Sequence, residues 1–547
     1  MTTNETSTVT TGGISLARQL ATEGVTHIFG IPGVQLDYAM NGLSKYADEI
    51  TFIATRHEQT ATYAADGYSR STGKIGVGLV VPGPGVLNAG AGLVTALACS
   101  SKVLFLAGQI PTRGIGAGLG LLHEIPDQSG LIAQLCRSST LVTDPDQVAG
   151  AIHGAMVALA AGPGPVAVEI PPDVLYRRTD GPAIGAEPWG TPPAGVTADL
   201  DAAAERLAAA ERPVIYVGGG GCAAEAWNEL AALATTLGAP LISSPNGKGA
   251  FDDRHPLAVL PLGHKELLHR ADVVLFVGTR ALNGQGRPLD VAPEAALISL
   301  NNDPRAFLAP RTLTQTITGD ARTGCAALVE RLGGSAREPW CHDLDEIREW
   351  IQSEFAPLEP QRSYVAALRA ALPDDTVLVN ELTQVGYAAR QLFPVHHPRS
   401  YLDPGYQGTL GYGYPTAIGA AVGNPHRPVV SLNGDGGFGY GLSEMATVMQ
   451  YQLPLVGVVF TDGAYGNVRR MHKQQFDGVH HGTDLTNPDM LKLADAFGMT
   501  GYRANSPEEF GQALSDTIAA NEPCLIDVPM GELPDPWAIV GRPWTAR

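Results

Sequence analysis

Short apolar runs alternate with longer amphipathic segments along most of this chain, and this alternation constrains the fold more than any other feature. The runs VGLVV (77–81), KVLFLAG (102–108) and PVAVEI (165–170) are five to seven residues long. Apolar runs of this length, separated by helical segments, are typical of parallel strands that are buried on both faces. The pattern predicts an α/β protein in which parallel sheets are flanked by helices.

The pattern falls into three blocks, which suits a chain of 547 residues. The first block closes at GPGPVAVEIPPDVL, and the segment 176–196 that follows is rich in Pro and Gly and has no period. The second block begins at RPVIYVGGGG, and the third begins near Gln361. We expect domains at 1–175, 196–335 and 361–547, and no exact repeat at a fixed sequence period.

Charge, cysteine spacing and the N-terminal segment argue against several classes of protein. The formal net charge of -19 argues against a nucleic-acid partner, which requires clustered Lys and Arg. The six cysteines lie far apart without a C-x-x-C pair, so we expect reduced thiols rather than a zinc site. The segment MTTNETSTVTTGG lacks the features of a signal peptide, and no long apolar run follows it. We therefore expect a cytoplasmic protein with no membrane partner.

Two acidic residues in glycine-containing turns each follow an apolar strand of the third block. PVVSLNGDGGF carries Asp435, and Asp462 follows the strand LPLVGVVF 27 positions later. A right-handed crossover would bring the carboxyl ends of these strands side by side. Mg²⁺ prefers one or two carboxylates together with phosphate oxygens, and a Gly turn before a helix offers N–H groups to a phosphate. The pair indicates a metal and diphosphate site; the alternative is that each Asp only satisfies turn backbone.

The GDG turn followed by TDGAYGN resembles the cofactor motif of thiamine-diphosphate-dependent enzymes, with the nearest likeness to the acetolactate synthase and benzoylformate decarboxylase group. FGIPGVQLD, ATRHEQTATYAADGYSRSTGKIGV, PGPGVLNAGAGLVTAL and LAGQIP resemble that group's pyrimidine-binding domain. LVNELTQVG and GTLGYGYPTAIGAA resemble its diphosphate-binding domain, so the likeness covers nearly the whole chain. The resemblance implies thiamine diphosphate and Mg²⁺ as cofactors, with a central domain between the two binding domains.

The resemblance also implies where the cofactors bind. Asp435, Asp462 and the carbonyl of Ala464 would bind the metal. The cofactor-binding residues would be Pro32, Glu58, Glu381, Gly408, Leu410, Gly434, Asp435, Gly436, Gly437, Asp462, Tyr465, Gly466 and Asn467. The group usually has Asn where Asp462 stands, so this site would carry one more negative charge.

The resemblance assigns catalytic roles to Glu58 and Leu410. Glu58 would place its carboxyl at N1′ of the cofactor's pyrimidine and favour the imino form that removes the C2 proton. Leu410 would be wedged between the two rings, so that the cofactor bends and proton transfer becomes intramolecular. Two alternatives stay open: Thr55 to Glu58 also fits a helix capping box, and Leu410 could be an ordinary core leucine.

Two more residues, Gln35 and His123, are expected catalytic candidates that line the substrate pocket, although a lone His is often structural. Arg469 and Arg470 could attract a substrate carboxylate or could form a solvated pair. Met471 stands where acetolactate synthases typically carry Trp, which makes a strict branched-chain biosynthetic role doubtful. The substrate is therefore less constrained than the cofactor.

Cofactor use in the second block is the remaining question. GTRALNGQG replaces the Arg-Phe-Asp-Asp segment of flavin-binding relatives, and VGGGG is also consistent with a tight turn that binds nothing, so we expect no FAD.

The expected function is decarboxylation of a 2-oxo acid with carboligation, on a 2-oxo acid, acyloin or dione substrate, in a homodimer or homotetramer. Alternatives within the superfamily are a 2-hydroxyacyl-CoA lyase and a 1,2-dione hydrolase. Alternatives from other classes are a flavin or nicotinamide oxidoreductase and a noncatalytic regulatory subunit.

Overall fold

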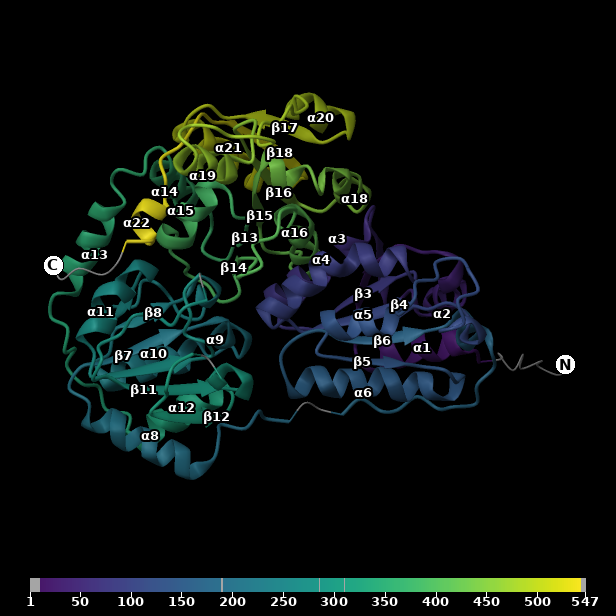
Figure 1. The fold of residues 1–547 in the computed structure, drawn as a ribbon, viewed down its shortest axis with the longest axis horizontal. Helices are drawn as coiled ribbons and strands as arrows, with labels where there is room; N and C mark the ends of the chain where they lie inside the picture. The colour runs from purple at the N-terminus through teal and green to yellow at the C-terminus, as the bar shows by residue number, and fades with distance from the viewer. Residues whose placement is uncertain (1–9, 188–189, 285, 309, 543–547) are drawn as a thin grey trace. The chain divides into compact units, whose positions relative to one another are not determined.

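Three six-stranded sheets organise the chain, and every strand pairing within them is parallel. The computed structural model describes residues 10–187, 190–284, 286–308 and 310–542. The chain divides into two compact units, Met1–Gly190 and Thr191–Arg547, of which the first holds one sheet and the second holds two. Helices cover the sheets (Figure 1), so the predicted α/β class with parallel sheets is confirmed.

The sheet of the first unit has the strand order β2-β1-β3-β4-β6-β5. Its strands are β1 (His27–Gly30), β2 (Thr51–Ala54), β3 (Gly76–Val80), β4 (Val103–Gly108), β5 (Ser138–Leu141) and β6 (Val166–Ile170). The helices are α1 (Gly12–Thr22), α2 (Asp37–Leu43), α3 (Glu58–Thr72), α4 (Pro84–Cys99), α5 (Gln128–Leu135), α6 (Val148–Ala161) and α7 (Pro172–Tyr176). Figure 1 shows α3 and α4 along one face of the sheet and α6 along the other, which explains why β3 and β4 are apolar at every position.

The central sheet has the order β12-β11-β10-β7-β8-β9. Its strands are β7 (Pro213–Val217), β8 (Leu241–Ser243), β9 (Ala258–Val259), β10 (Val273–Val277), β11 (Ala296–Asn301) and β12 (Gln315–Thr318). The helices around it are α8 (Thr197–Ala209), α9 (Gly219–Ala223), α10 (Trp227–Leu237), α11 (His264–Arg270), α12 (Ala321–Arg331) and α13 (Leu344–Glu354). Read from β9, this is the doubly wound order found in dinucleotide-binding folds.

The third sheet has the order β14-β13-β15-β16-β18-β17. Its strands are β13 (Val377–Asn380), β14 (Tyr401–Leu402), β15 (Val429–Gly434), β16 (Leu455–Thr461), β17 (Thr500–Arg503) and β18 (Cys524–Pro529). The helices are α14 (Gln361–Ala371), α15 (Gln384–Leu392), α16 (Gly413–Gly423), α17 (Asp435–Phe438), α18 (Met445–Gln450), α19 (Gly466–Gln475), α20 (Met490–Ala496), α21 (Pro507–Ala520) and α22 (Trp537–Val540).

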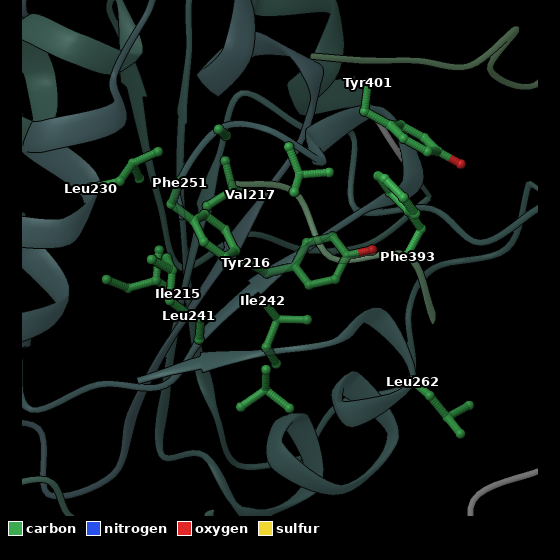
Figure 2. Packing of buried hydrophobic residues seen from close by; sticks show 14 of the residues in the cluster. Ile215, Tyr216, Val217, Leu230, Leu241, Ile242, Phe251, Leu262, Phe393 and Tyr401 are labelled. Carbon is green, nitrogen blue, oxygen red and sulfur yellow. The ribbon is translucent and has the colours of Figure 1, made fainter. Parts of the chain in front are cut away.

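One buried apolar cluster runs through both the central and the third sheet of the second unit. Figure 2 shows Tyr216 and Ile242 of the central sheet in the same cluster as Phe393 and Tyr401. Phe393 directly follows α15, and Tyr401 is the first residue of β14. The rings of Phe393 and Tyr401 stack at 6.2 Å between centroids. These two domains therefore share a core. Among the described residues, no helix has both the length and the apolar character needed to cross a membrane.

Candidate active site

The two acidic turns predicted from the sequence lie at neighbouring strand ends of the third sheet. Strands β15 and β16 pair in parallel with Asn433 opposite Val459 and Gly434 opposite Phe460, and each strand leads directly into its acidic turn. Asp435 is close enough to Asp462 that its charge raises the pKa of Asp462. The prediction that a crossover would bring these strand ends together is confirmed.

Asp435 is held by several donors. Its side chain is 4% exposed. Oδ1 accepts a hydrogen bond from the backbone N–H of Gly436 at 2.9 Å, and Oδ2 accepts from the backbone N–H of Gly463 at 2.8 Å. Oδ2 also accepts from Nδ2 of Asn487 at 2.6 Å. The carboxylate is therefore fixed in one orientation, with the turn after β16 as one of its supports.

Asp462 is held less tightly than Asp435. Its Oδ1 accepts from the backbone N–H of Ala464 at 3.0 Å, and its Oδ2 lies 4.0 Å from a guanidinium nitrogen of Arg469. Arg469 also pairs with Asp484 at 3.5 Å. Arg469 thus lies beside the carboxylate of Asp462, which carries the extra negative charge at the position where the resemblance leads us to expect Asn.

The two carboxylates repel each other's charge. Burial raises the pKa of Asp435. Burial, followed by the charge of Asp435, raises the pKa of Asp462 to about 6. Two neighbouring carboxyl groups with raised pKa values form a favourable cation-binding site, because a divalent ion between them would remove the repulsion between their negative charges. Among the described residues there is no cluster of three or more His, Cys, Asp or Glu side chains suited to a metal, so the acidic pair would need backbone or ligand oxygens to complete the coordination.

A cavity of about 250 Å³ opens beside these turns. It is lined by Glu381, Gly408, Leu410, Gly434, Asp435, Gly436, Gly437, Asp462, Ala464, Tyr465, Gly466 and Asn467, all of which are sequence-predicted site residues. Leu410 is 43% exposed, so it is not the core leucine that the alternative interpretation required. The structure therefore gathers the predicted residues of the third block around one cavity.

Glu58 lies in the first unit, at the first residue of α3. The residue that caps this helix is His57, whose Nδ1 accepts a hydrogen bond from the backbone N–H of Gln59 at 3.2 Å. Thr55 instead donates to the carbonyls of Gly30 and His57. The capping-box alternative for Glu58 is therefore wrong. The carboxylate of Glu58 is half-buried and accepts from Nδ2 of Asn88 at 3.0 Å.

Comparison with known families and proteins agrees with this geometry. Three models match the chain: the N-terminal TPP binding domain of thiamine pyrophosphate enzymes at residues 10–131, their central domain at 200–328, and their C-terminal TPP binding domain at 381–528. This chain belongs to the thiamine pyrophosphate enzyme family. The predicted thiamine diphosphate cofactor and three-domain α/β architecture are thereby confirmed.

Curated relatives match over almost their entire length. A probable 2-ketoarginine decarboxylase of Pseudomonas aeruginosa is 37% identical over 535 residues, which cover 95% of this chain and 94% of the relative. A probable acetolactate synthase large subunit of Methanocaldococcus jannaschii is 32% identical over 555 residues, 94% of this chain and 91% of the relative. The large subunit of acetolactate synthase isozyme 3 of Escherichia coli is 30% identical over 536 residues, 93% and 92% respectively.

The residues around the cavity fit the diphosphate end of the family's cofactor. A Cβ atom at Gly436 would lie 2.8 Å from the ring of Tyr465, and a Cβ at Gly437 would lie 1.6 Å from Oε1 of Glu381. Tyr465 and Glu381 therefore fill the space beside these two positions, so the turn after Asp435 accepts only glycine there. A turn of this kind beside two carboxylates suits a diphosphate bound together with a cation.

Gln35 contacts the segment that carries His123 in the first unit. Nε2 of Gln35 donates to the carbonyl of Leu122 at 3.3 Å, next to His123, whose backbone has φ +66°. Within the described residues, Oε1 of Gln35 and Nδ1 of His123 are buried and make no hydrogen bond. Pro32 is exposed at the end of β1. The hydrogen-bonding capacity of these two atoms is therefore unused in this structure, and the roles of the three residues stay predictions.

The Gly-rich turn after β7 has a packing explanation. The backbone N–H of Gly220 donates to the carbonyl of Gly278 at 2.9 Å, and a Cβ at Gly220 would lie 2.6 Å from the Cα of Gly278. The turns after β7 and β10 therefore touch backbone to backbone at the point where the central sheet reverses its strand order. This contact is sufficient reason for the glycines.

Several contacts were not anticipated from the sequence. Asn487 supports Asp435 from 52 residues away, and Asn88 supports Glu58 from 30 residues away. Arg470 is not solvated but donates to Oε1 of Gln384 and Oδ1 of Asn467, each at 2.6 Å. The contacts of Asn487, Asn88 and Gln384 each join segments that lie far apart in the sequence, and no local pattern predicts them.

Proposed function

We propose that this enzyme uses thiamine diphosphate and Mg²⁺ to decarboxylate a 2-oxo acid and to join the remaining acyl unit to a carbonyl acceptor. The observation that carries the proposal is the juxtaposition of Asp435 and Asp462 at adjacent strand ends, in one cavity with Leu410. Burial and the charge of Asp435 make ionisation of Asp462 unfavourable, and a divalent cation bound between the two carboxylates would relieve this cost.

Each residue of the proposed site would have a separate role. Asp435, Asp462 and the carbonyl of Ala464 would hold Mg²⁺, and Gly436 and Gly437 would face the diphosphate. Leu410 would support the bent cofactor, and Glu58 would hold a proton at the pyrimidine ring. Thiamine diphosphate supplies a nucleophilic carbon that adds to the 2-oxo group and stabilises the electron pair left when CO₂ departs. Gln35 and His123 would contact the substrate, as the unpaired atoms of both side chains allow.

A second candidate is decarboxylation alone, of a 2-oxo acid with a long polar tail. Two observations favour it. The relative with 37% identity carries the name 2-ketoarginine decarboxylase, and Met471 stands where the resemblance described above leads us to expect the Trp of acetolactate synthases. Arg470 donates to Gln384 and Asn467 and pairs with Asp535 at 3.2 Å, so its charge is already compensated within the chain and we do not expect it to bind the carboxylate of a second 2-oxo acid. The 2-hydroxyacyl-CoA lyase and dione hydrolase alternatives have no such support.

A substrate panel tests these proposals. The purified protein, with thiamine diphosphate and Mg²⁺, is incubated with pyruvate, pyruvate plus 2-oxobutyrate, 2-ketoarginine, acyloins, diones and 2-hydroxyacyl-CoA esters, and the products are identified by mass. A carboligation product supports the first proposal, and an aldehyde without carboligation supports the second. Cleavage of a CoA ester or dione, with no reaction of any 2-oxo acid, would contradict both.

The enzyme would act as a homodimer or homotetramer. Glu58 belongs to one compact unit and the acidic pair to the other, so each unit presents part of a site. Apolar side chains are exposed next to these parts: Val34 and Leu122 near Gln35, and Tyr440 and Val468 near Leu410. Exposed apolar surface of this kind is typical of an interface. Sedimentation that finds a fully active monomer would reject this proposal.

Three further predictions are kept as proposals. The domains would span 1–175, 196–335 and 361–547. FAD would not be bound, which mass spectrometry of the purified protein can test. The protein would be cytoplasmic; residues 1–9 of the polar segment behind that prediction lie outside the described residues.

A further inference from the structure

The loop Asp403–Tyr412 carries Leu410 into the cavity but has little structure of its own. It connects β14 to α16 without a helix or strand. Gly405, Gly408 and Gly411 have positive φ angles of +65°, +56° and +79°. Glycines in this region confer conformational freedom on an unrestrained chain, so the position of Leu410 must be fixed by contacts with other elements.

The beginning of the loop is fixed by a buried ion pair. Asp403 is 1% exposed. Its Oδ1 accepts from a guanidinium nitrogen of Arg390 at 2.9 Å and from the backbone N–H of Gly405 at 3.0 Å, and its Oδ2 lies 2.8 Å from Nε of Arg390. Arg390 lies on α15, the helix whose first residue, Gln384, lines the cavity. Removing one partner of such a pair leaves an uncompensated buried charge.

The end of the loop is fixed by a second buried carboxylate, Glu381, which is 2% exposed. Its Oε1 accepts from the backbone N–H of Gly411 at 3.2 Å, and its Oε2 accepts from the backbone N–H of Gly413 at 2.8 Å. Oε1 also lies against Gly437, where a Cβ would come within 1.6 Å of it. Glu381 therefore joins the end of the loop to the turn after Asp435.

We propose that Glu381 and the Asp403–Arg390 pair are positioning residues, which hold the loop at both ends and so set the place of Leu410 in the cavity. The proposal rests on the cofactor-bending role of Leu410 put forward above. The sequence predicted Glu381 as a cofactor contact; because its two oxygens already accept from Gly411 of the loop and from Gly413 at the start of α16, we expect it to act on the cofactor through Leu410.

Backbone hydrogen–deuterium exchange of the full-length, cofactor-free protein tests the anchoring. In Glu381→Gln, an amide group replaces one acceptor oxygen, so Gly411 or Gly413 loses its partner. We expect amide exchange in peptides covering 403–413 to rise about tenfold or more in this variant and in Asp403→Asn. Glu444→Gln is the matched control, because Glu444 is fully buried in the same unit and accepts from Oγ1 of Thr447 at 2.6 Å, a hydrogen bond outside residues 403–413.

Unchanged exchange in both folded variants, or an equal rise in these peptides in Glu444→Gln, would overturn the anchoring. Should Glu381→Gln fail to fold, Asp403→Asn decides the result alone. With thiamine diphosphate and Mg²⁺ bound, the variants should exchange the cofactor's C2 proton about tenfold more slowly, at cofactor affinity changed less than about threefold. A looser loop with wild-type C2 exchange would refute the positioning role. Absence of cofactor binding in the wild type would instead contradict the proposed function.

Discussion

The first and the third sheet are built alike but end in different chemistry. Numbered within each domain, both have the strand order 2-1-3-4-6-5, as β2-β1-β3-β4-β6-β5 and β14-β13-β15-β16-β18-β17. The middle sheet has another order. The repeated topology gives each binding domain an equivalent row of loops at the carboxyl ends of its strands.

The loops at corresponding strand ends differ in charge. The third strand leads into Pro82 and Gly83 in the first sheet but into Asp435 in the third. The fourth strand leads into Gln109 in the first sheet but into Asp462 in the third. Only the third sheet therefore concentrates negative charge where a metal and a diphosphate could bind.

The second strand shows the opposite assignment. After β2 the chain reaches Glu58, the one carboxylate predicted to act in the first domain. After β14 it reaches Asp403, which is paired with Arg390, and then the apolar Leu410, which is the residue predicted to act there. The comparison teaches that the topology supplies the place and the residues at the strand ends supply the chemistry. The following variants test this division of roles between the two sheets.

The largest effect is expected from Asp435→Ala. It removes a metal-binding oxygen and leaves the diphosphate charge uncompensated, so cofactor affinity should fall by about 10²-fold or more. Calorimetric titration of thiamine diphosphate at fixed Mg²⁺ measures this. Asp527→Ala is the control, since Asp527 is also buried in this domain but pairs with Thr461 and Arg503. Equal affinities of the two variants would contradict the assignment.

Glu58→Gln should affect proton transfer but not binding. Gln keeps the size of the side chain but cannot share a proton, so exchange of the cofactor's C2 proton should slow at least about 10²-fold. Quenched-flow NMR on bound cofactor reports this step. Glu23→Gln, at the end of α1 in the same unit, serves as the control. Exchange within a few-fold of wild type, in a variant that holds cofactor, would remove Glu58 from the mechanism.

Leu410→Ala should lower turnover about tenfold and change cofactor affinity far less, because orientation is lost while the metal and diphosphate contacts remain. Steady-state kinetics at saturating cofactor, together with the titration above, separates the two quantities. A loss of affinity as large as the loss of turnover would make Leu410 a binding residue instead.

The smallest effect is expected from Asp462→Asn, which keeps a side-chain oxygen and removes one charge. Cofactor affinity at low Mg²⁺ should equal or slightly exceed that of the wild type. A variant that loses the cofactor as fully as Asp435→Ala would refute the shared metal site.

The pH dependence of Asp462 sharpens this test. The pKa of Asp462 in the metal-free protein is raised from its ordinary value of 3.8 to about 6. The folded chain therefore binds this proton more tightly than the unfolded chain does. The resulting stabilisation of the folded state is fully present below pH 3.8 and is lost as the pH rises through about 6. Protons then compete with Mg²⁺, and wild-type Mg²⁺ affinity should fall as pH is lowered through about 6. Asp462→Asn should show a smaller fall in a Mg²⁺ titration at several pH values. The same dependence of Mg²⁺ affinity on pH in the wild type and in Asp462→Asn would contradict the raised pKa of Asp462.

The sequence predicted what depends on local pattern. Apolar runs predicted the parallel sheets, and the crossover rule predicted that Asp435 and Asp462 would meet. The matching strand order of the first and third sheets was not predictable, because topology can repeat where residues do not. The capping box failed because Thr55 and Glu58 fit the motif in spacing only, while His57 had the backbone geometry of a cap. Asn487 and the anchors of the Leu410 loop were missed because they join segments that no local rule connects.

Lys248 has a consequence for how the chain can be divided. It is 2% exposed, donates to the carbonyl of Phe393 at 2.7 Å and lies 5.6 Å from the ring centre of Tyr401. A cut near residue 190 separates two compact units, and among the described residues neither of the buried apolar clusters within them crosses this point. A cut between residues 335 and 361 would instead expose Phe393 to water and leave the amine of Lys248 without its hydrogen-bond acceptor. We therefore expect the central and third domains to fold only when they are expressed together, whereas the first domain could be exchanged by itself.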